Sequence, residues 1–189
     1  MPSADMLVLP SVGAGFLTAP NTDAAMDLDT AAKATVTPQS ETGTQLARAG
    51  YASGWSHVWT DSASDQVAIL AFVFTQGGKP TMFTAYVRSY LGSLSSAFAV
   101  SDGVIPEAFD YVLNGTVLGG TSVFCQGVFF ALSSAAVEVR TCEHAPSGEA
   151  QVEQLAATEY RWAAQQFGVA APTIVGSPPP PTAQSSSTE

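Results

Sequence analysis

The sequence predicts an α+β fold: a single domain in which two amphipathic helices pack on a mainly antiparallel sheet that contains a disulfide-linked β-hairpin. Three observations predict this class. Residues 51–60 alternate in chemistry as a strand does, residues 66–75 form an almost unbroken apolar strand, and the two cysteines flank two β-like runs. The strand-like segments follow one another instead of alternating with helices, which favours an antiparallel sheet.

Composition limits what the domain can bind. The chain has 189 residues, 46% of them hydrophobic, and 16 acidic against 6 basic side chains give a formal net charge of −10. This apolar content is enough for one folded domain. A chain without a cluster of Lys or Arg is expected to bind nucleic acid or an anionic membrane surface poorly. We therefore expect no nucleic-acid partner. We also expect no membrane span, because no stretch of the sequence reaches the roughly 18 apolar residues that a span requires.

Three segments are expected along the chain. Residues 1–45 form a partly ordered N-terminal arm and loop, with a strand or extended arm near residues 7–9, then a long loop and a short helix at residues 24–34. Residues 46–170 form the α+β core. Residues 171–189 form a disordered tail rich in Pro and Ser. We expect residues 173–189 to be dispensable for folding because they offer few side chains that can pack.

Periodicity predicts the middle of the core. Both faces of the strand at residues 66–75 are apolar, so this strand should lie centrally in the sheet and be covered on both sides. A glycine-containing turn then leads to a helix at residues 81–94. Pro80 stands near the first helical position, and apolar side chains follow at helical spacing.

Turn and cap signals predict the C-terminal part of the core. Asn114-Gly115, between two short apolar runs, is expected to be a hairpin turn. Residues 147–167 are expected to form the second helix, with Ser147 as its cap and Gly168 after its end.

Cys125 and Cys142 are predicted to form a disulfide across a hairpin. If Ser133-Ser134 is a two-residue turn, the two cysteines lie directly opposite each other at a non-hydrogen-bonded position, where a disulfide can form. Ser-Ser is not a favoured turn pair, so a four-residue loop in the same register and two separate buried thiols stay open as alternatives. The same register gives four further pairs: Phe130 with Val137 and Val128 with Val139 on an apolar face, and Phe129 with Glu138 and Gly127 with Arg140 on the other.

No pattern of residues indicates catalysis. Nothing in the spacing of His57 and His144 requires them to converge on a metal ion. The chain has neither the G-x-S-x-G motif of a nucleophile elbow nor a glycine-rich loop followed by a phosphate-binding Lys and Ser. We therefore expect a protein that is not an enzyme, with no catalytic residues, metal or cofactor. A carboxylate or serine hydroxyl hydrogen-bonded to His57 in a cleft would favour an unrecognised hydrolase instead.

The candidate ligand-binding residues are Tyr51, Trp55, His57 and Trp59. They occupy alternate positions of one strand, so we expect them to share a face. Flat aromatic side chains there can stack on sugar rings or line an apolar pocket, with His57 as the polar group. The alternative, which we favour, is that this face belongs to the core and packs against a helix such as the one at residues 81–94.

Several patterns together carry a resemblance to a known group of proteins. They are the string from Gly50-Tyr51 through Trp55, the apolar strand VAILAFVF, the amphipathic helix after it, and the later Gly-Val-Phe-Phe hairpin with its terminal helix. Over roughly residues 46–167 the chain resembles small exported or lipid-anchored cell-envelope domains of actinobacteria, which have uncharacterised or sensor-like roles. Some of these are similar to the PsbP-like α/β/α sandwich. The resemblance implies a non-enzymatic envelope protein and carries over no catalytic residue, and the chain lacks the lipid-attachment cysteine near its start.

The expected function is therefore a non-catalytic, exported cell-envelope protein that binds an apolar or glycan ligand or a protein partner. The alternative is a structural or assembly component of a surface complex, with the proline-rich tail as a tether. Residues 1–18 lack the basic start of a signal peptide, so an extracellular or envelope location implies a leader outside this sequence. A cytoplasmic location is the alternative.

Overall fold

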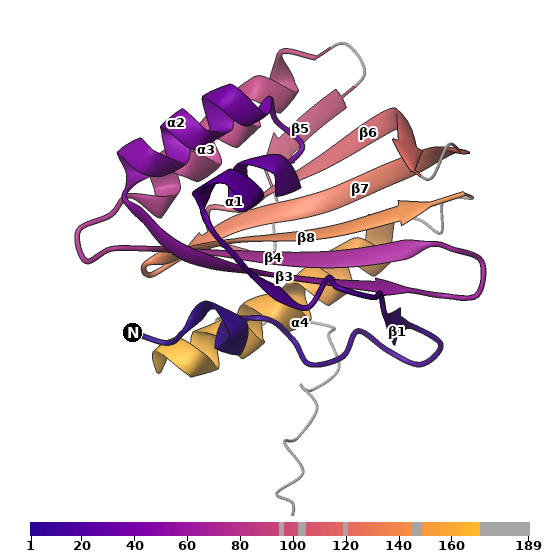
Figure 1. Cartoon of the computed structure of the whole chain (residues 1–189), viewed down its shortest axis with the longest axis horizontal. Helices are drawn as coiled ribbons and strands as arrows, with labels where there is room; N and C mark the ends of the chain where they lie inside the picture. Colours follow the sequence, from indigo (N-terminus) through magenta and orange to yellow (C-terminus); the bar gives the residue numbers. More distant parts are fainter. Residues whose placement is uncertain (95–96, 102–104, 119–120, 145–148, 171–189) are drawn as a thin grey trace, which may run out of the picture.

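The computed structural model describes residues 1–94, 97–101, 105–118, 121–144 and 149–170, and it has the predicted α+β fold. Among these residues, eight strands form one sheet in which all neighbouring strands are antiparallel. Helices cover both faces of the sheet, so the molecule has three layers (Figure 1). On one face lie α1 (Leu28–Ala34), α2 (Gln39–Ala49) and α3 (Pro80–Gly92), and on the other lie α4 (Glu149–Phe167) and the short 3-10 helix η1 (Ala4–Leu7).

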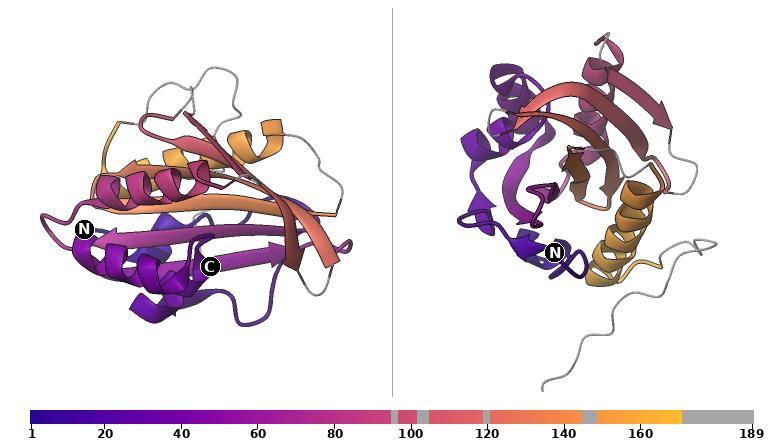
Figure 2. Two further views of the ribbon diagram at one scale, coloured as in Figure 1. Left: turned by 90° about the horizontal axis from the view of Figure 1, so that it is seen from above. Right: turned by 90° about the vertical axis from the view of Figure 1, so that its right-hand side faces the viewer.

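The sheet has the strand order β1-β3-β4-β8-β7-β6-β5, and β2 also pairs with β3. Figure 2 shows the twist of this sheet, with α4 on the side away from α2. The strands are β1 (Leu17–Thr18), β2 (Ala24–Met26), β3 (Tyr51–Thr60), β4 (Gln66–Phe74), β5 (Ala97–Ser101), β6 (Phe109–Leu118), β7 (Thr121–Leu132) and β8 (Ala135–Glu143).

Strand β4 lies at the centre of the packing, as predicted. It runs between β3 and β8, and every residue from Val67 to Phe74 is buried. Alternate side chains enter the two cores: Val67, Ile69, Ala71 and Val73 on the side of α4, and Leu70, Phe72 and Phe74 on the side of α1, α2 and α3. The prediction of a strand that is covered on both faces is confirmed.

The β7–β8 hairpin has the predicted register. Cys125 lies opposite Cys142, their Cα atoms are 4.1 Å apart, and the two residues form a disulfide. Ser133 and Ser134 make a two-residue turn, in which Ser133 adopts a left-handed φ of 55°. The four further pairs predicted from this register are also present.

The two predicted helices are confirmed. Helix α3 begins at Pro80 and buries three apolar side chains at helical spacing: Phe83, Val87 and Leu91. Helix α4 ends at Phe167, and Gly168 follows with a left-handed φ of 66°. The predicted cap Ser147 and the tail at residues 171–189 lie outside the described residues. Within those residues, none of the helices combines the length and the apolarity that crossing a bilayer requires.

The N-terminal arm holds more regular structure than the sequence predicts. The sequence predicts a strand or an extended arm near residues 7–9, and the structure has no strand there. Ala4–Leu7 form η1, and Val8 follows it with extended backbone angles but without strand pairing. All three apolar side chains of this run are nevertheless buried. The apolar run therefore indicates that these residues are buried against the sheet. It does not indicate that they form one of its strands.

The remainder of the arm also differs from the expected long loop. The helix expected at residues 24–34 is shorter, because β2 precedes it and Asp27 caps α1 by accepting a hydrogen bond from the backbone N–H of Thr30 at 2.8 Å. Helix α2 lies where no helix is predicted. Its Ser, Thr and Gly residues weaken the helical pattern, and burial of Leu46 compensates. The division of the chain into arm and core at residue 45 stays a prediction.

The predicted hairpin turn at Asn114-Gly115 is wrong. Strand β6 continues through both residues to Leu118, and its register with β7 shifts between Leu113 and Thr116. A glycine inside a strand accommodates such an irregularity as readily as it forms a turn. The Asn-Gly pair is therefore compatible with both structures, and in this chain it lies in the strand irregularity.

We expect the disulfide to contribute about 3 kcal/mol to stability, because it closes a loop between residues that are 17 apart in sequence. Replacing both Cys125 and Cys142 by Ser should lower the free energy of unfolding by this amount in urea titration. Wild-type protein under a reductant should lose the same amount. Two free thiols in the denatured, unreduced wild-type protein would contradict the disulfide itself.

Candidate functional site

Strand β3 does not place the four predicted ligand-binding residues on one face. The pairing of β3 with β4 shifts between Tyr51 and Ser53, and Tyr51 packs in the core on the side of α1 to α3. Its hydroxyl donates a hydrogen bond to the carbonyl oxygen of Met26 at 2.7 Å. Trp55 and Trp59 contact the opposite core, beside η1 and α4. The expectation of a common face is wrong for Tyr51, because a β-bulge reverses the alternation.

His57 is buried within a small polar network at the edge of the sheet. Its Nε2 atom lies 3.0 Å from Oγ1 of Thr18 in β1, and its Nδ1 atom lies 3.4 Å from Oδ1 of Asp23 just before β2. The imidazole stacks on the ring of Trp59 with centroids 3.7 Å apart. Burial lowers the pKa of His57, and the Asp23 carboxylate opposes this shift only in part. The imidazole is therefore neutral near pH 7.

The two tryptophans differ in their environment. Trp59 is 2% exposed and belongs to the core. Trp55 is half-buried, and its Nε1 donates a hydrogen bond of 2.7 Å to Asp23, so one carboxylate faces both Trp55 and His57. Neither ring packs on α3, which lies on the other face of the sheet. That part of the expectation is wrong, since η1 and the apolar residues after it supply the cover instead.

The network around His57 has the order hydroxyl, imidazole, carboxylate that hydrolases use. A carboxylate therefore lies near His57, as a hydrolase would require. Two cavities lie beside α4 and a groove lies between α1 and α2, and none of these three is lined by His57, Thr18 or Asp23. The network connects β1 and the start of β2 to β3. These contacts support a structural role for His57 at the sheet edge, and its part in ligand binding stays a prediction.

A cavity of about 630 Å³ lies beside α4, between the irregular segment after η1 and the ends of β4 and β8. We call it the α4 cavity. Its apolar walls are Leu9, Val12, Phe16, Val67 and Leu155. Val67 pairs with Trp59 across β3 and β4, so the cavity lies next to the predicted aromatic cluster without including it. Pockets of this volume hold small organic molecules.

Thr141 is the buried polar residue of the α4 cavity. It is 5% exposed, and its hydroxyl has no hydrogen-bond partner in the described part of the chain. It lies opposite Val67, and it follows Val137 and Val139 at alternate positions of β8. The sequence contains the signal that could have found it: a polar residue that continues the apolar face of a strand.

Glu159 on α4 binds the backbone of Leu9, a residue that lines the α4 cavity. Its Oε2 atom accepts a hydrogen bond of 3.0 Å from the backbone N–H of Leu9, and Trp162 donates one of 2.9 Å to the carbonyl of Met6. Glu159 is completely buried, and burial raises its pKa to about 8 although the bond from Leu9 acts to lower it. Two side chains of α4 therefore fasten the N-terminal segment.

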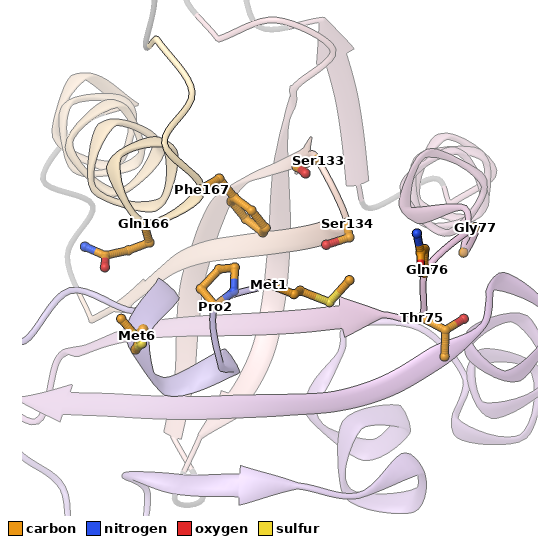
Figure 3. A pocket seen from close by; sticks show the side chains of 11 residues that line it. Met1, Pro2, Met6, Thr75, Gln76, Gly77, Ser133, Ser134, Gln166 and Phe167 are labelled. Atoms are coloured by element: carbon orange, nitrogen blue, oxygen red, sulfur yellow. The ribbon is translucent and has the colours of Figure 1, made fainter.

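A second, more open cavity of about 780 Å³ lies at the other end of α4. Figure 3 shows Phe167 pointing away from α4 toward Pro2 and Met1. Ser133 and Ser134, of the β7–β8 turn, lie to the right of Phe167 in this view. A groove of about 810 Å³ separates α1 from α2 on the other face of the sheet. Among these three, the α4 cavity is the one lined by a buried side chain with an unpaired hydroxyl.

The sheet also contains a buried polar cluster away from these cavities. Tyr111 and Arg140 both donate hydrogen bonds to the same Oε1 atom of Glu138, which is completely buried. Gly127 is required beside it, because a Cβ atom there would lie 2.6 Å from the ring of Tyr111. The cluster joins β6 to β8 across β7 and is structural. The described residues include no group of three His, Cys, Asp or Glu side chains that could hold a metal ion.

No protein-family model matches the chain, and no curated protein is significantly similar to it. Among solved structures, the extracellular domain of PknH from Mycobacterium tuberculosis aligns with 81% of this chain and 82% of that domain, at a TM-score of 0.49 and 12% sequence identity. A score at this level carries no conclusion about function. The resemblance to actinobacterial envelope domains stays a prediction, and the functional conclusion rests on the residues themselves.

The tryptophans should differ in their effect on stability. Replacing Trp59 by Ala should lower the free energy of unfolding by about 3 to 5 kcal/mol, because it empties a large volume of the core. Replacing the half-buried Trp55 by Ala should cost under about 2 kcal/mol. Urea titration of both variants measures the difference. A double variant that unfolds like the wild type would overturn the core assignment of Trp59.

Glu159 should make stability depend on pH. Its folded pKa of about 8 exceeds the ordinary value of 4.5, so the folded protein keeps a proton that the unfolded chain releases between these limits. Stability should therefore fall as the pH rises through this window.

The Glu159→Gln variant removes this titration and keeps an acceptor for the N–H of Leu9. Relative to wild type it should gain about 3 to 5 kcal/mol between roughly pH 5 and pH 8. Urea titrations at both pH values test this. An equal stability difference at the two pH values would show that Glu159 titrates normally.

Proposed function

We propose that this chain is a non-catalytic ligand-binding module of the cell envelope, and that it binds a small apolar molecule in the α4 cavity. One observation carries the proposal: a partly open cavity of about 630 Å³ is lined by five apolar side chains and by the buried residue Thr141. A mostly apolar pocket with a few placed polar groups is the usual form of a small-molecule site.

The disulfide supports the extracellular part of the proposal. Cys125 and Cys142 are joined, and structural disulfides persist in oxidising compartments such as the cell exterior and the periplasm. The formal charge of −10 is typical of a protein that does not bind anionic surfaces. An apolar ligand outside the cytoplasm fits both properties.

The proposed binding site lies beside the aromatic residues of β3 and does not include them. Trp59 is buried in the core, and His57 lies between Thr18 and Asp23. Neither ring is therefore available to stack on a ligand. Val67, which pairs with Trp59, is at the same time a wall of the α4 cavity. In this proposal the aromatic residues support the site and do not contact the ligand.

Binding of the fluorescent hydrocarbon diphenylhexatriene tests this proposal. Wild-type protein should raise its fluorescence in a saturable manner, and Leu155→Gln should weaken binding at least about tenfold, because it places an amide in the apolar wall. Leu17→Gln is the matched control, since Leu17 is 76% exposed on β1 and lies outside the cavity.

Thermal unfolding establishes that both variants are folded. Saturable binding that Leu155→Gln does not alter would place the site elsewhere. Absence of binding by the wild type, together with no co-purified small molecule in mass spectrometry, would refute the proposal and favour a structural component of a surface complex.

A further inference from the structure

We infer that the ligand of the α4 cavity is a cationic amphiphile, a mainly apolar molecule with a positively charged nitrogen, and that this nitrogen binds beside Glu143. The inference rests on the proposed function and adds the chemical class of the ligand. Three observations lead to it: the charges in the cavity lining, the position of Glu143 on β8, and the difference in exposure between the apolar and the polar parts of the lining.

The charges in the lining favour a cation over an anion. Among the described residues that line the α4 cavity, Glu143 is the one with a charged side chain. None of the six basic residues of the chain lines it; they are Lys33, Arg48, Lys79, Arg88, Arg140 and Arg161. An anionic head group would lose hydration there, gain no counter-charge and be repelled by the carboxylate.

The position of Glu143 on β8 directs its side chain to the face of the sheet on which α4 lies. Successive side chains of a strand point to opposite faces. Val137 and Val139 pack in the core on the α4 side, and Glu143 follows Val139 at an even spacing. The pairing of β8 with β7 continues without a register shift as far as Glu143, so no bulge reverses the alternation.

The lining divides into a buried apolar part and an exposed polar part. Leu9 and Val67 are buried, whereas Glu143 is partly exposed and Gln151 and Gln154 on α4 are exposed. An amphiphile matches this division when its chain contacts the apolar walls and its nitrogen stays near water beside Glu143.

The Glu143 carboxylate can accept a hydrogen bond from such a ligand. Glu143 also has an interaction within the protein. The two oxygens of a carboxylate offer about four acceptor positions, so that interaction does not exclude a ligand N–H. The net charge of −10 adds a long-range attraction for a cation.

Competition among three ligands of equal chain length tests the inference. Diphenylhexatriene is the reporter, at low ionic strength and about pH 7.5, where an amine is protonated and a carboxylic acid is ionised. All ligands are kept below the concentrations at which they form micelles. Decylamine should displace the probe at a lower concentration than decanol, and at a concentration about tenfold below that of decanoate. Added salt should weaken decylamine and leave decanol unchanged.

The Glu143→Gln variant isolates the proposed ion pair. It should raise the dissociation constant for decylamine roughly threefold, as expected for one partly exposed ion pair, and leave the affinity for decanol unchanged. Glu41→Gln is the matched control, because it removes the same charge from an exposed position of α2 that does not line the cavity. It should leave the affinity for decylamine unchanged.

The outcomes separate this inference from the proposed function. If diphenylhexatriene binds and Leu155→Gln weakens it, but decanol or decanoate competes as well as decylamine, the cavity binds apolar ligands and the inference is wrong. An equal loss of decylamine affinity in Glu143→Gln and Glu41→Gln, or no loss in either, also overturns it. If the probe does not bind wild-type protein at all, the proposed function itself fails.

Discussion

The rest of the structure depends on the burial of β4 on both of its faces. Every residue from Val67 to Phe74 is buried, and exposing either face would cost a large part of the hydrophobic free energy of folding. The chain must therefore supply two covering layers. Helices α1 to α3 form one, and on the other face α4 contacts β7 and β8 while η1 contacts β3 and β4. The N-terminal segment is thus a required part of the second layer.

Covering a sheet with a short 3-10 helix and an irregular segment has two physical consequences. Such a segment cannot satisfy its own backbone groups as an α-helix does, so the buried N–H of Leu9 needs an acceptor from elsewhere. Glu159 supplies it at the cost of burying a carboxyl group, which explains the raised pKa. An irregular segment also fills space less completely than a helix, and the α4 cavity lies beside it. The buried acid and the cavity have the same structural origin.

The parts of the fold that the sequence predicts are those whose signals are local. An almost unbroken apolar run identifies β4, and the spacing of Cys125 and Cys142 about a two-residue turn predicts their pairing, because both signals act within one or two adjacent strands. The contact between Leu9 and Glu159 joins residues 150 apart, and no local pattern encodes it. The predicted face of Tyr51 is wrong for a related reason, since one β-bulge reverses the two-residue alternation and no local sequence pattern marks its position.

Buried polar atoms in this molecule fall into two groups, and the difference locates the candidate site. Glu138 lies in packed core, where Tyr111 and Arg140 share its Oε1 atom and no molecule from solution can approach. Thr141 is also buried, but this residue lines a cavity large enough for a small molecule. A polar side chain that is paired within packed core stabilises the sheet, whereas a residue that lines a cavity can also contact a molecule from solution. Contact with a cavity, more than burial itself, therefore separates the residues of the proposed site from those that hold the sheet together.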